Sequence, residues 1–390
     1  MKKVTDSVTF RSGVTVSNRL ALAPMLTYSG EPGGFASEDT LNYYQARSQA
    51  AGLLITEFHY VSENGGPCGP LGFPEQLGIY DDEHLASIKA IAKALKKSGN
   101  KAILQIHHGG REAKGRHALG QEVLAPSAID YEFLDYPVRE MTNAEILEII
   151  RDFGRATKRA IAAGFDGVEI HGANHYGIQQ FFSAFSNRRT DEWGGSLEKR
   201  MAFPLAVVKE VQRVVSEYAP RDFMVGYRIS PEEIHGDTVG YTYKESRQLI
   251  KKVVEQKLDY IHLSLWDGHD SSPKGSKKSY AELFKEVLDP ETKLIIVGNV
   301  FSEAEAQRAI EKYADLIAVG RGTLIDPVFG QKIMTGAGDT IVPEISPEQL
   351  ERSQLTPGLF KIFTCADTLG LHKLPNNPSI YGLKMEDEEK

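Results

Sequence analysis

The stretch Gly167-Val-Glu-Ile-His-Gly-Ala-Asn-His-Tyr176 joins a short strand pattern to a run of polar side chains. Val168 and Ile170 take one face of the strand, whereas Glu169 and His171 take the other, because side chains alternate along an extended chain. We expect the apolar face to meet an outer helix and the polar face to point inward. The stretch therefore predicts a strand whose carboxyl end delivers an imidazole, a carboxamide and a phenol.

Seven other segments repeat this short apolar pattern, with amphipathic helical stretches between most of them. The eight strand candidates are Leu20–Met25, Leu53–Val61, Ala102–His107, Gly167–His171, Met224–Ser230, Tyr260–Leu265, Leu294–Asn299 and Leu316–Gly320. Eight strands that alternate with helices are the number needed for a single closed (β/α)₈ barrel of the α/β class. An open doubly wound sheet is the alternative.

Two helices have recognisable starts. Thr142-Asn-Ala-Glu145 is a capping-box pattern, and the helix that it begins runs to Ala163, where Gly164 can cap it. Ser302-Glu-Ala-Glu305 begins the helix before the last strand in the same way.

The remaining segments are predicted additions to a barrel core of residues 19–330. Thr9–Val16, around Gly13, is predicted as an N-terminal hairpin that closes the barrel floor. The connection 109–141 after the third strand is long enough to be functional. Residues 343–390 form a tail with one helix over Pro357–Leu369 and an acidic end. We expect the tail to pack on the barrel or on a neighbouring subunit of a homo-oligomer.

Composition narrows the function classes. The 390 residues are 41% apolar and 25% charged, and 45 basic and 53 acidic residues give a net charge of −8. No basic run is present, so we expect no nucleic-acid partner. Cys68 and Cys365 are too few for a cysteine-ligated iron–sulfur cluster. Neither a signal peptide nor an apolar run of about 20 residues is evident, so we expect a cytoplasmic protein without membrane contact.

Polar residues continue along two other strands. Arg228 shares a face with Gly226 and Ser230, and His262 shares one with Ser264. A buried charge must be paired or must meet a charged ligand. For Glu169, an internal pairing, for instance with Arg228, is as plausible as a functional role. For Arg228 and His171 a function is favoured, because both lie at the carboxyl ends of strands, where barrel active sites are built.

Two glycine loops predict a phosphate site. The seventh strand ends in Val297-Gly-Asn299 and the eighth in Val319-Gly-Arg-Gly322. Barrels often bind phosphate at these two loops, and Arg321 adds a fork-shaped donor. The alternative is that the glycines only permit tight turns.

No metal site is expected. His107 and His108 are adjacent on a strand and face opposite ways, and the spacing of His235, His262 and His269 is not typical of a ligand set. Arg111 is either a loop anchor or a substrate contact.

The segment Asn187-Arg-Arg-Thr-Asp-Glu-Trp-Gly-Gly-Ser196, with Arg200 after it, resembles the signature loop of the old yellow enzyme family. The resemblance covers most of residues 7–330. It implies that residues 1–342 form a barrel that binds flavin mononucleotide (FMN) non-covalently, with NADH or NADPH as reductant. The implied cofactor-binding residues are Pro24, Met25, Leu26, Phe58, Gln105, His171, Arg228, Gly298, Asn299, Gly320 and Arg321.

The resemblance also implies catalytic roles. His171 and Asn174 would bind the carbonyl oxygen of an α,β-unsaturated carbonyl compound, such as an enone. Hydride from the flavin would reach Cβ, and Tyr176 would protonate Cα. Tyr28 and His108 are expected to reach the substrate.

Several positions depart from the family pattern. Leu26 stands where a Thr or Cys usually touches the flavin, and Thr27 is a candidate substitute. Phe58 stands where a small residue is usual, His175 replaces a common Gly, and Trp193 replaces a Tyr. The redox potential and the substrate preference therefore stay open.

Two other functions remain possible. The first is a flavin-free aldolase or isomerase that acts on a phosphorylated substrate. Such an enzyme would need a Lys or paired acids in the barrel mouth, and no strand end offers a Lys. The second is a non-catalytic flavoprotein, although mere binding needs no proton donor such as Tyr176.

Overall fold

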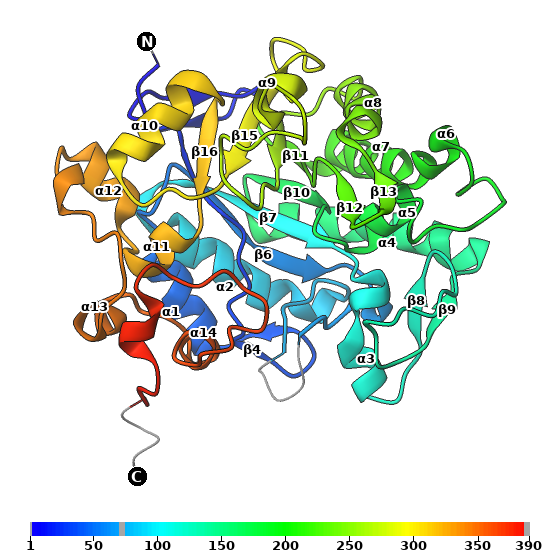
Figure 1. Ribbon diagram of the computed structural model, residues 1–390, viewed down its shortest axis with the longest axis horizontal. Helices are drawn as coiled ribbons and strands as arrows, with labels where there is room; N and C mark the ends of the chain where they lie inside the picture. Colours follow the sequence, from blue (N-terminus) through cyan, green and yellow to red (C-terminus); the bar gives the residue numbers. More distant parts are fainter. Residues whose placement is uncertain (1, 70–74, 386–390) are drawn as a thin grey trace.

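Eight parallel strands form a closed barrel in the computed structural model, which describes residues 2–69 and 75–385 (Figure 1). The strands are β3 (Leu20–Leu22), β6 (Leu53–Tyr60), β7 (Lys101–His107), β10 (Gly167–Gly172), β11 (Met224–Ile229), β14 (Tyr260–Leu263), β15 (Lys293–Val297) and β16 (Leu316–Val319). β16 pairs with β3, which closes the circle. The predicted (β/α)₈ barrel is therefore confirmed, and the open sheet is wrong.

The first strand is shorter than the predicted Leu20–Met25. The backbone N–H of Ala23 still donates to Val319, but the next residue is Pro24. Proline has no backbone N–H, so the hydrogen-bond ladder cannot continue through it. The chain therefore leaves the barrel at Pro24, at the carboxyl end of β3.

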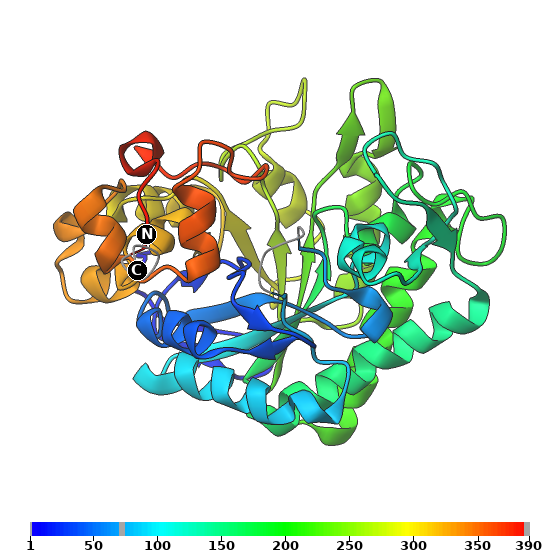
Figure 2. The same cartoon turned by 90° about the horizontal axis from the view of Figure 1, so that it is seen from below.

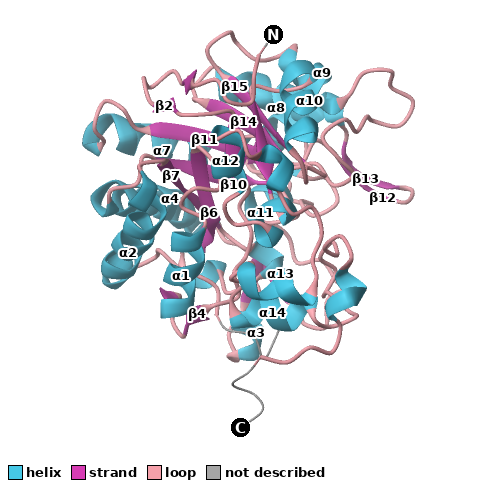
Figure 3. Ribbon diagram, turned by 90° about the vertical axis from the view of Figure 1, so that its left-hand side faces the viewer, coloured by secondary structure: helices cyan, strands magenta, loops and turns pink. Residues whose placement is uncertain are grey.

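Helices surround the strands on the outside (Figures 2 and 3). The longer ones are α1 (Glu38–Ala46), α2 (Leu85–Leu95), α4 (Asn143–Ala163), α7 (Ala202–Tyr218), α8 (Tyr243–Val254) and α10 (Glu303–Lys312). The predicted caps are confirmed. Thr142 accepts from the backbone of Glu145, Gly164 ends α4 with φ 83°, and Ser302 caps α10. None of the helices in residues 2–69 and 75–385 is long and apolar enough to cross a membrane.

The N-terminal hairpin fills one end of the barrel. β1 (Val8–Thr9) and β2 (Thr15–Val16) pair antiparallel, and their apolar side chains pack against the inward-facing residues of the barrel strands. The ring of Phe10 meets that of Tyr260 at 6.0 Å between centroids. Because this end is filled, a ligand site is expected at the other end of the barrel, where the strands have their carboxyl ends.

Additional short elements lie in the loops. The connection 109–141 holds η4 (Gly110–Glu112), α3 (Lys114–Ala118), β8 (Val123–Ala125) and β9 (Val138–Glu140), and the loop after β11 forms a hairpin of β12 (Glu233–His235) and β13 (Thr238–Tyr241). The loop after β16 continues through α11 (Arg321–Ile325) and α12 (Phe329–Met334).

The tail contains α13 (Pro347–Arg352), α14 (Pro357–Phe363) and η6 (Asn377–Ile380). The predicted helix over Pro357–Leu369 is wrong beyond Phe363, because carbonyls at its end bond to other parts of the tail. The amide of Asn377 donates to the carbonyl of Phe363, and the N–H of Gly382 to that of Thr364. The acidic segment 386–390 lies outside the described residues.

The tail contacts the barrel of its own chain, and Figure 2 shows it in orange and red beside the barrel. The Arg47 guanidinium donates to the carbonyl of Ser353 at 2.8 Å, and the Thr356 hydroxyl donates to the carbonyl of Thr27. A Cβ at Gly358 would collide with the backbone of Tyr28. The tail is therefore fitted closely against the segment that follows β3.

Candidate active site

A cavity of about 400 Å³ opens at the carboxyl ends of the barrel strands, a size typical of cofactor and ligand sites. All of the predicted site residues except His108 line it: Pro24, Met25, Leu26, Tyr28, Phe58, Gln105, His171, Asn174, Tyr176, Arg228, Gly298, Asn299, Gly320 and Arg321. Its charged lining consists of two arginines and, among the described residues, no carboxylate. The cavity therefore favours an anionic ligand.

His108 is tied into a neighbouring loop and does not line the cavity. Its Nε2 lies 2.9 Å from Oδ1 of Asn64, and its Nδ1 accepts from the N–H of Gly110. Burial lowers the pKa of His108 to about 3, so the ring is neutral. The expectation that His108 reaches a substrate therefore has no support in this geometry.

A nitrogen of His171 and one of Asn174 lie side by side in the cavity lining. Nδ1 of His171 accepts a 3.3 Å hydrogen bond from the N–H of Ala173, so the ring proton belongs on Nε2. That Nε2 lies 3.4 Å from Nδ2 of Asn174, which is also a donor. Burial and the nearby Arg228 lower the pKa of His171 to about 3, so the imidazole is neutral. The pair can thus donate two hydrogen bonds to one shared acceptor.

Asn174 is oriented by a chain of hydrogen bonds across the cavity mouth. Ser264 donates to Oδ1 of Asn174 at 2.8 Å, and Nη2 of Arg228 donates to Ser264 at 3.1 Å. Since Oδ1 is occupied, the amide nitrogen is the atom that turns toward His171. The backbone of Asn174, at φ 57°, is held by a bond from its N–H to the hydroxyl of Ser230.

Tyr176 lies in an aromatic cluster on one wall of the cavity. The Phe58 ring packs 3.8 Å from that of His107 and 4.9 Å from that of Tyr176. The ring of Tyr176 lies 5.2 Å from that of His171. Burial raises the pKa of Tyr176 well above its ordinary value, so its phenol keeps its proton. A neutral proton donor therefore stands beside the two hydrogen-bond donors.

A buried network supports Gln105 from below. Oε1 of Glu169 accepts from Nε2 of Gln105 at 2.6 Å, and Oε2 lies 2.9 Å from Nδ1 of His262. Burial alone would raise the pKa of Glu169, but His262, Arg228 and Gln105 together outweigh burial and hold the pKa below its ordinary value. The internal network considered for Glu169 is therefore present, but its direct partners are Gln105 and His262 and not Arg228.

The glycine loops after β15 and β16 meet at one end of the cavity. Nη2 of Arg321 donates to Oδ1 of Asn299 at 2.5 Å, and Nη1 donates to the carbonyl of Lys373 in the tail. Gly298 has φ 137°, and a Cβ there would lie 2.8 Å from the backbone of Gly268, so the turn itself requires this glycine. For Gly298, the alternative that the glycines only permit tight turns is therefore sufficient.

Gly320 lines the cavity beside Arg321. Its backbone, with φ −98° and ψ −91°, lies outside the regular α and β regions. An added Cβ would lie 3.3 Å from Met25 and 3.7 Å from Ala23, so a side chain there would press on the residues that follow β3.

Residues 7–339 match the NADH:flavin oxidoreductase / NADH oxidase family. The chain belongs to this family. The prediction of the old yellow enzyme family is confirmed, and the protein is a flavin-dependent oxidoreductase that uses FMN and a nicotinamide reductant. The flavin-free aldolase or isomerase is thereby excluded.

Known proteins agree with this assignment. The chain is 40% identical over 362 residues to the probable NADH-dependent flavin oxidoreductase YqiG of Bacillus subtilis, which covers 92% of this chain and 95% of that protein. It is 38% identical to the NADH:acrylate oxidoreductase of Vibrio harveyi, covering 93% of this chain but only 36% of that protein. Morphinone reductase in complex with tetrahydroNAD has a TM-score of 0.74 at 27% identity, covering 90% and 94% of the two chains.

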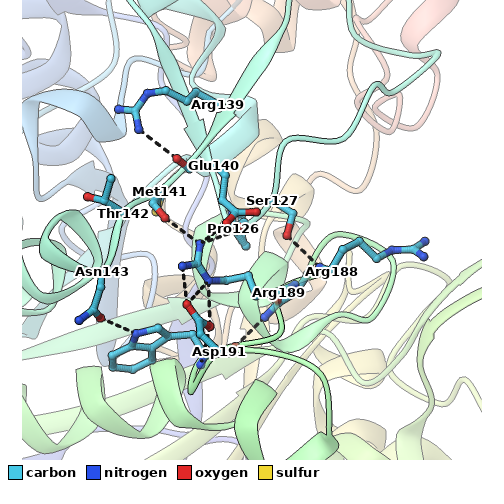
Figure 4. Close-up of polar contacts among 12 residues, drawn as sticks. Pro126, Ser127, Arg139, Glu140, Met141, Thr142, Asn143, Arg188, Arg189 and Asp191 are labelled. Atoms are coloured by element: carbon cyan, nitrogen blue, oxygen red, sulfur yellow. Dashed lines mark hydrogen bonds and ion pairs between the residues drawn. The ribbon is translucent and has the colours of Figure 1, made fainter.

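The signature loop of the flavin oxidoreductase does not line the cavity; it holds the 109–141 connection in place (Figure 4). Nη1 of Arg189 donates to the carbonyls of Pro126 at 3.0 Å and Met141 at 2.7 Å, and Nη2 pairs with Asp191 at 2.6 Å. The indole of Trp193 donates to Oδ1 of Asn143 at 2.8 Å. The motif is therefore structural.

Thr27 does not replace the missing hydroxyl at Leu26. Leu26 lines the cavity, whereas the Thr27 side chain is fully buried and donates to Oε1 of Glu57 at 2.7 Å. An aliphatic side chain thus occupies the position where the family usually has a Thr or Cys.

Several lining residues were missed by sequence reasoning. They include Ser264, Leu265 and Trp266 after β14, Phe301 after β15, and Leu359, Phe363, Leu371 and His372 from the tail. For Ser264 a signal existed, because the strand alternation had already placed it on the polar face with His262. For the tail residues, no periodic pattern in the sequence predicts that they contact the barrel.

Proposed function

We propose that the protein is an ene reductase, in which FMN reduced by NADH or NADPH delivers hydride to the Cβ of an α,β-unsaturated carbonyl compound. The observation that carries this proposal is the convergence of His171 Nε2 and Asn174 Nδ2, two donors that share one acceptor position. A carbonyl oxygen is an acceptor that suits both.

Unsatisfied atoms and free space support FMN in this cavity. Oε1 of Gln105 and Nε of Arg228 are buried and, within the described residues, have no hydrogen-bond partner. Gln105 would hold the pyrimidine edge of the flavin, and Arg228 would lie beside it. Arg321 and Asn299 would hold the phosphate, with Gly320 beside them in the cavity lining. When bound and reduced, FMN supplies the hydride.

His171 and Asn174 stabilise the negative charge that develops on the substrate oxygen. Their two N–H groups are fixed before the substrate arrives, by Ala173 on one side and Ser264 on the other. Preorganised donors of this kind contribute several kcal/mol to an enolate-like transition state, roughly 3 kcal/mol for each donor. Since the imidazole is neutral, it keeps its N–H and does not protonate the oxygen outright.

Tyr176 supplies the proton to Cα. Its phenol is buried and protonated, and its ring lies 5.2 Å from that of His171. A positioned general acid of this kind accelerates proton transfer by about 100- to 10,000-fold. The ring of Phe58 packs against Tyr176 and narrows this part of the cavity, which favours small or flat substrates.

The names of relatives support the same chemistry. The Vibrio harveyi relative is an NADH:acrylate oxidoreductase, and acrylate carries a double bond conjugated to a carboxyl group. This chain spans about a third of that protein, so the substrate class is inferred from the cavity and not transferred from the name.

An anaerobic spectral titration tests the proposal. The purified protein is reduced with NADH or NADPH and then mixed with 2-cyclohexenone. We expect flavin absorbance that bleaches with nicotinamide and returns with the enone, with 2-cyclohexenone converted to cyclohexanone. Bleaching that only oxygen reverses would contradict the enone as oxidant and would favour an NADH oxidase.

A further inference from the structure

We propose that His175, Glu233 and His235 form a binding site for a divalent transition-metal ion of the Zn²⁺ type. This His–Glu–His cluster lies outside the cavity and is not used by the proposed reaction. No metal was expected at His235, because its spacing from His262 and His269 is not typical of a ligand set. The fold supplies the missing ligands by bringing the β12–β13 hairpin against the loop that follows β10.

The ligand atoms have the spacing that a small ion needs. Nδ1 of His175 lies 3.8 Å from Oε2 of Glu233, and Nε2 of His235 lies 3.2 Å from Oε1 of Glu233. One atom from each of the three residues lies within 4.8 Å of the other two. Ligand atoms of a tetrahedral zinc ion are about 3.3 Å apart, given Zn–N and Zn–O bonds of about 2.0 Å. Small shifts of these side chains would therefore bring three ligand atoms to the separations that a zinc ion needs.

The chemistry of the three groups also fits. Two imidazoles and one carboxylate are a ligand set that binds Zn²⁺ and related ions. The Glu233 side chain is buried and anchored by a 2.7 Å hydrogen bond from Nε2 of Gln179 to its Oε2, which is the kind of outer support that metal ligands have. The two imidazoles are partly exposed, with side-chain exposures of 45% and 41%. A fourth position is thus open to water.

The local charges allow a divalent cation. Glu233 places a carboxylate between the two imidazoles, 3.8 Å from Nδ1 of His175 and 3.2 Å from Nε2 of His235. Arg111 is a cation that acts on Glu233, but its Nε is paired with Glu112 and its guanidinium lies over the ring of Tyr131.

The position of His175 connects the cluster to the catalytic loop. His175 lies between Asn174 and Tyr176, and both Asn174 and His175 have left-handed backbones, with φ of 57° and 65°. The N–H of His175 already bonds to Oε1 of Gln179 at 3.1 Å. A bound ion would join this loop to the β12–β13 hairpin and hold Asn174 and Tyr176 more rigidly.

Zinc uptake by the holoenzyme tests the inference without substrate. The FMN-loaded protein is treated with a chelator, desalted, and dialysed against Zn²⁺, and bound zinc is measured by elemental analysis. We expect one zinc ion per chain in the wild type, a higher melting temperature with Zn²⁺, and an affinity at least tenfold lower in His235→Gln. His117→Gln, which removes an exposed histidine elsewhere, is the matched control and should bind like the wild type.

Two outcomes would overturn the inference. Equal zinc binding by His235→Gln and the wild type would show that the ion is held elsewhere. No zinc uptake by the wild type would show that the three side chains only contact one another and do not hold a metal. Because neither readout uses an enone, a failure here is distinguishable from a failure of the ene-reductase proposal.

Discussion

The Ser264 hydroxyl donates a 2.8 Å hydrogen bond to Oδ1 of Asn174 and so fixes which end of that amide faces His171. The two residues follow β14 and β10, which are separated in the barrel by β11. Arg228, on β11, donates to the oxygen of Ser264, which leaves the hydroxyl proton for Asn174. One hydroxyl thus sets the direction of a donor that the proposed reaction uses.

Replacing Ser264 by Ala should release the Asn174 amide without removing any group that contacts the substrate. We expect kcat/KM for 2-cyclohexenone to fall about 3- to 10-fold, which corresponds to the loss of one hydrogen bond. FMN content should be unchanged. Ser264→Thr keeps the hydroxyl and should retain most of the activity. If the loss in Ser264→Ala came only from the change in side-chain volume, Ser264→Thr, which also changes the volume, would lose activity as well.

Replacing Tyr176 by Phe should separate the two halves of the reaction. Reduction by NADH does not need the phenol and should keep its rate, whereas reoxidation by 2-cyclohexenone should slow by about 100- to 10,000-fold. Stopped-flow absorbance of the two half-reactions measures this. Equal slowing of both halves would assign Tyr176 to nicotinamide binding or to structure and not to proton donation.

Arg321 should contribute directly to FMN retention. It is half-buried and offers charged donors at the end of the cavity where Asn299 and Gly320 meet. We expect Arg321→Ala to weaken FMN binding about 10- to 100-fold, since a hydrogen bond from a charged group contributes about 1.5–3 kcal/mol. Fluorescence titration with FMN measures the affinity. Arg308→Ala, on the exposed side of α10, is the matched control, and an equal loss there would point to a general charge effect.

The barrel and most of the candidate site could be predicted from the sequence because both follow local rules. Apolar runs of strand length set the eight strands, and alternation placed Glu169, Arg228 and His262 on inward faces. Residues at the carboxyl ends of parallel strands necessarily meet at one rim, which explains why His171, Arg228 and Arg321 reach the same cavity.

The rest of the candidate site depends on tertiary contacts, which no local sequence pattern predicts. His108 follows β7 directly, but its bonds to Asn64 and Gly110 hold it in the neighbouring loop. Leu371 and His372 reach the cavity only because the tail folds back over its mouth, where the ring of His372 lies 4.1 Å from that of Trp266.

Arg189 should stabilise the fold and leave the chemistry unchanged. Its guanidinium is buried, bridges Pro126 and Met141, and pairs with Asp191. We expect Arg189→Ala to lower the free energy of unfolding by about 3 kcal/mol, because two carbonyls and a carboxylate lose their partner. The adjacent Arg188 has an exposed side chain, so Arg188→Ala should change stability by less than about 0.5 kcal/mol. Urea unfolding compares the two variants, and similar losses in both would refute the assigned role.

Buried neutral histidines should make the protein sensitive to mild acid. Burial lowers the pKa of His59, His108 and His171 to about 3, from an ordinary value of 6.5. Between these values the unfolded chain binds more protons than the folded one, so the free energy of unfolding falls as the pH falls from about 6.5 toward 3. Glu57 acts in the opposite direction, because burial raises its pKa from 4.5 to about 7 and the folded protein binds the extra proton in that window. The three histidines together outweigh Glu57, so the free energy of unfolding should fall in mild acid.

His59→Asn isolates one of these contributions. Nδ1 of His59 lies 3.0 Å from the carbonyl of Glu57, and the Asn amide can donate to the same carbonyl without titrating. Between pH 7 and 5.5 the wild type should lose about 1 kcal/mol more unfolding free energy than the variant, since one pKa unit corresponds to about 1.4 kcal/mol. Urea unfolding at both pH values, at constant excess FMN, measures the difference. If the wild type and His59→Asn showed the same pH dependence, His59 would already be protonated or solvated in the folded protein.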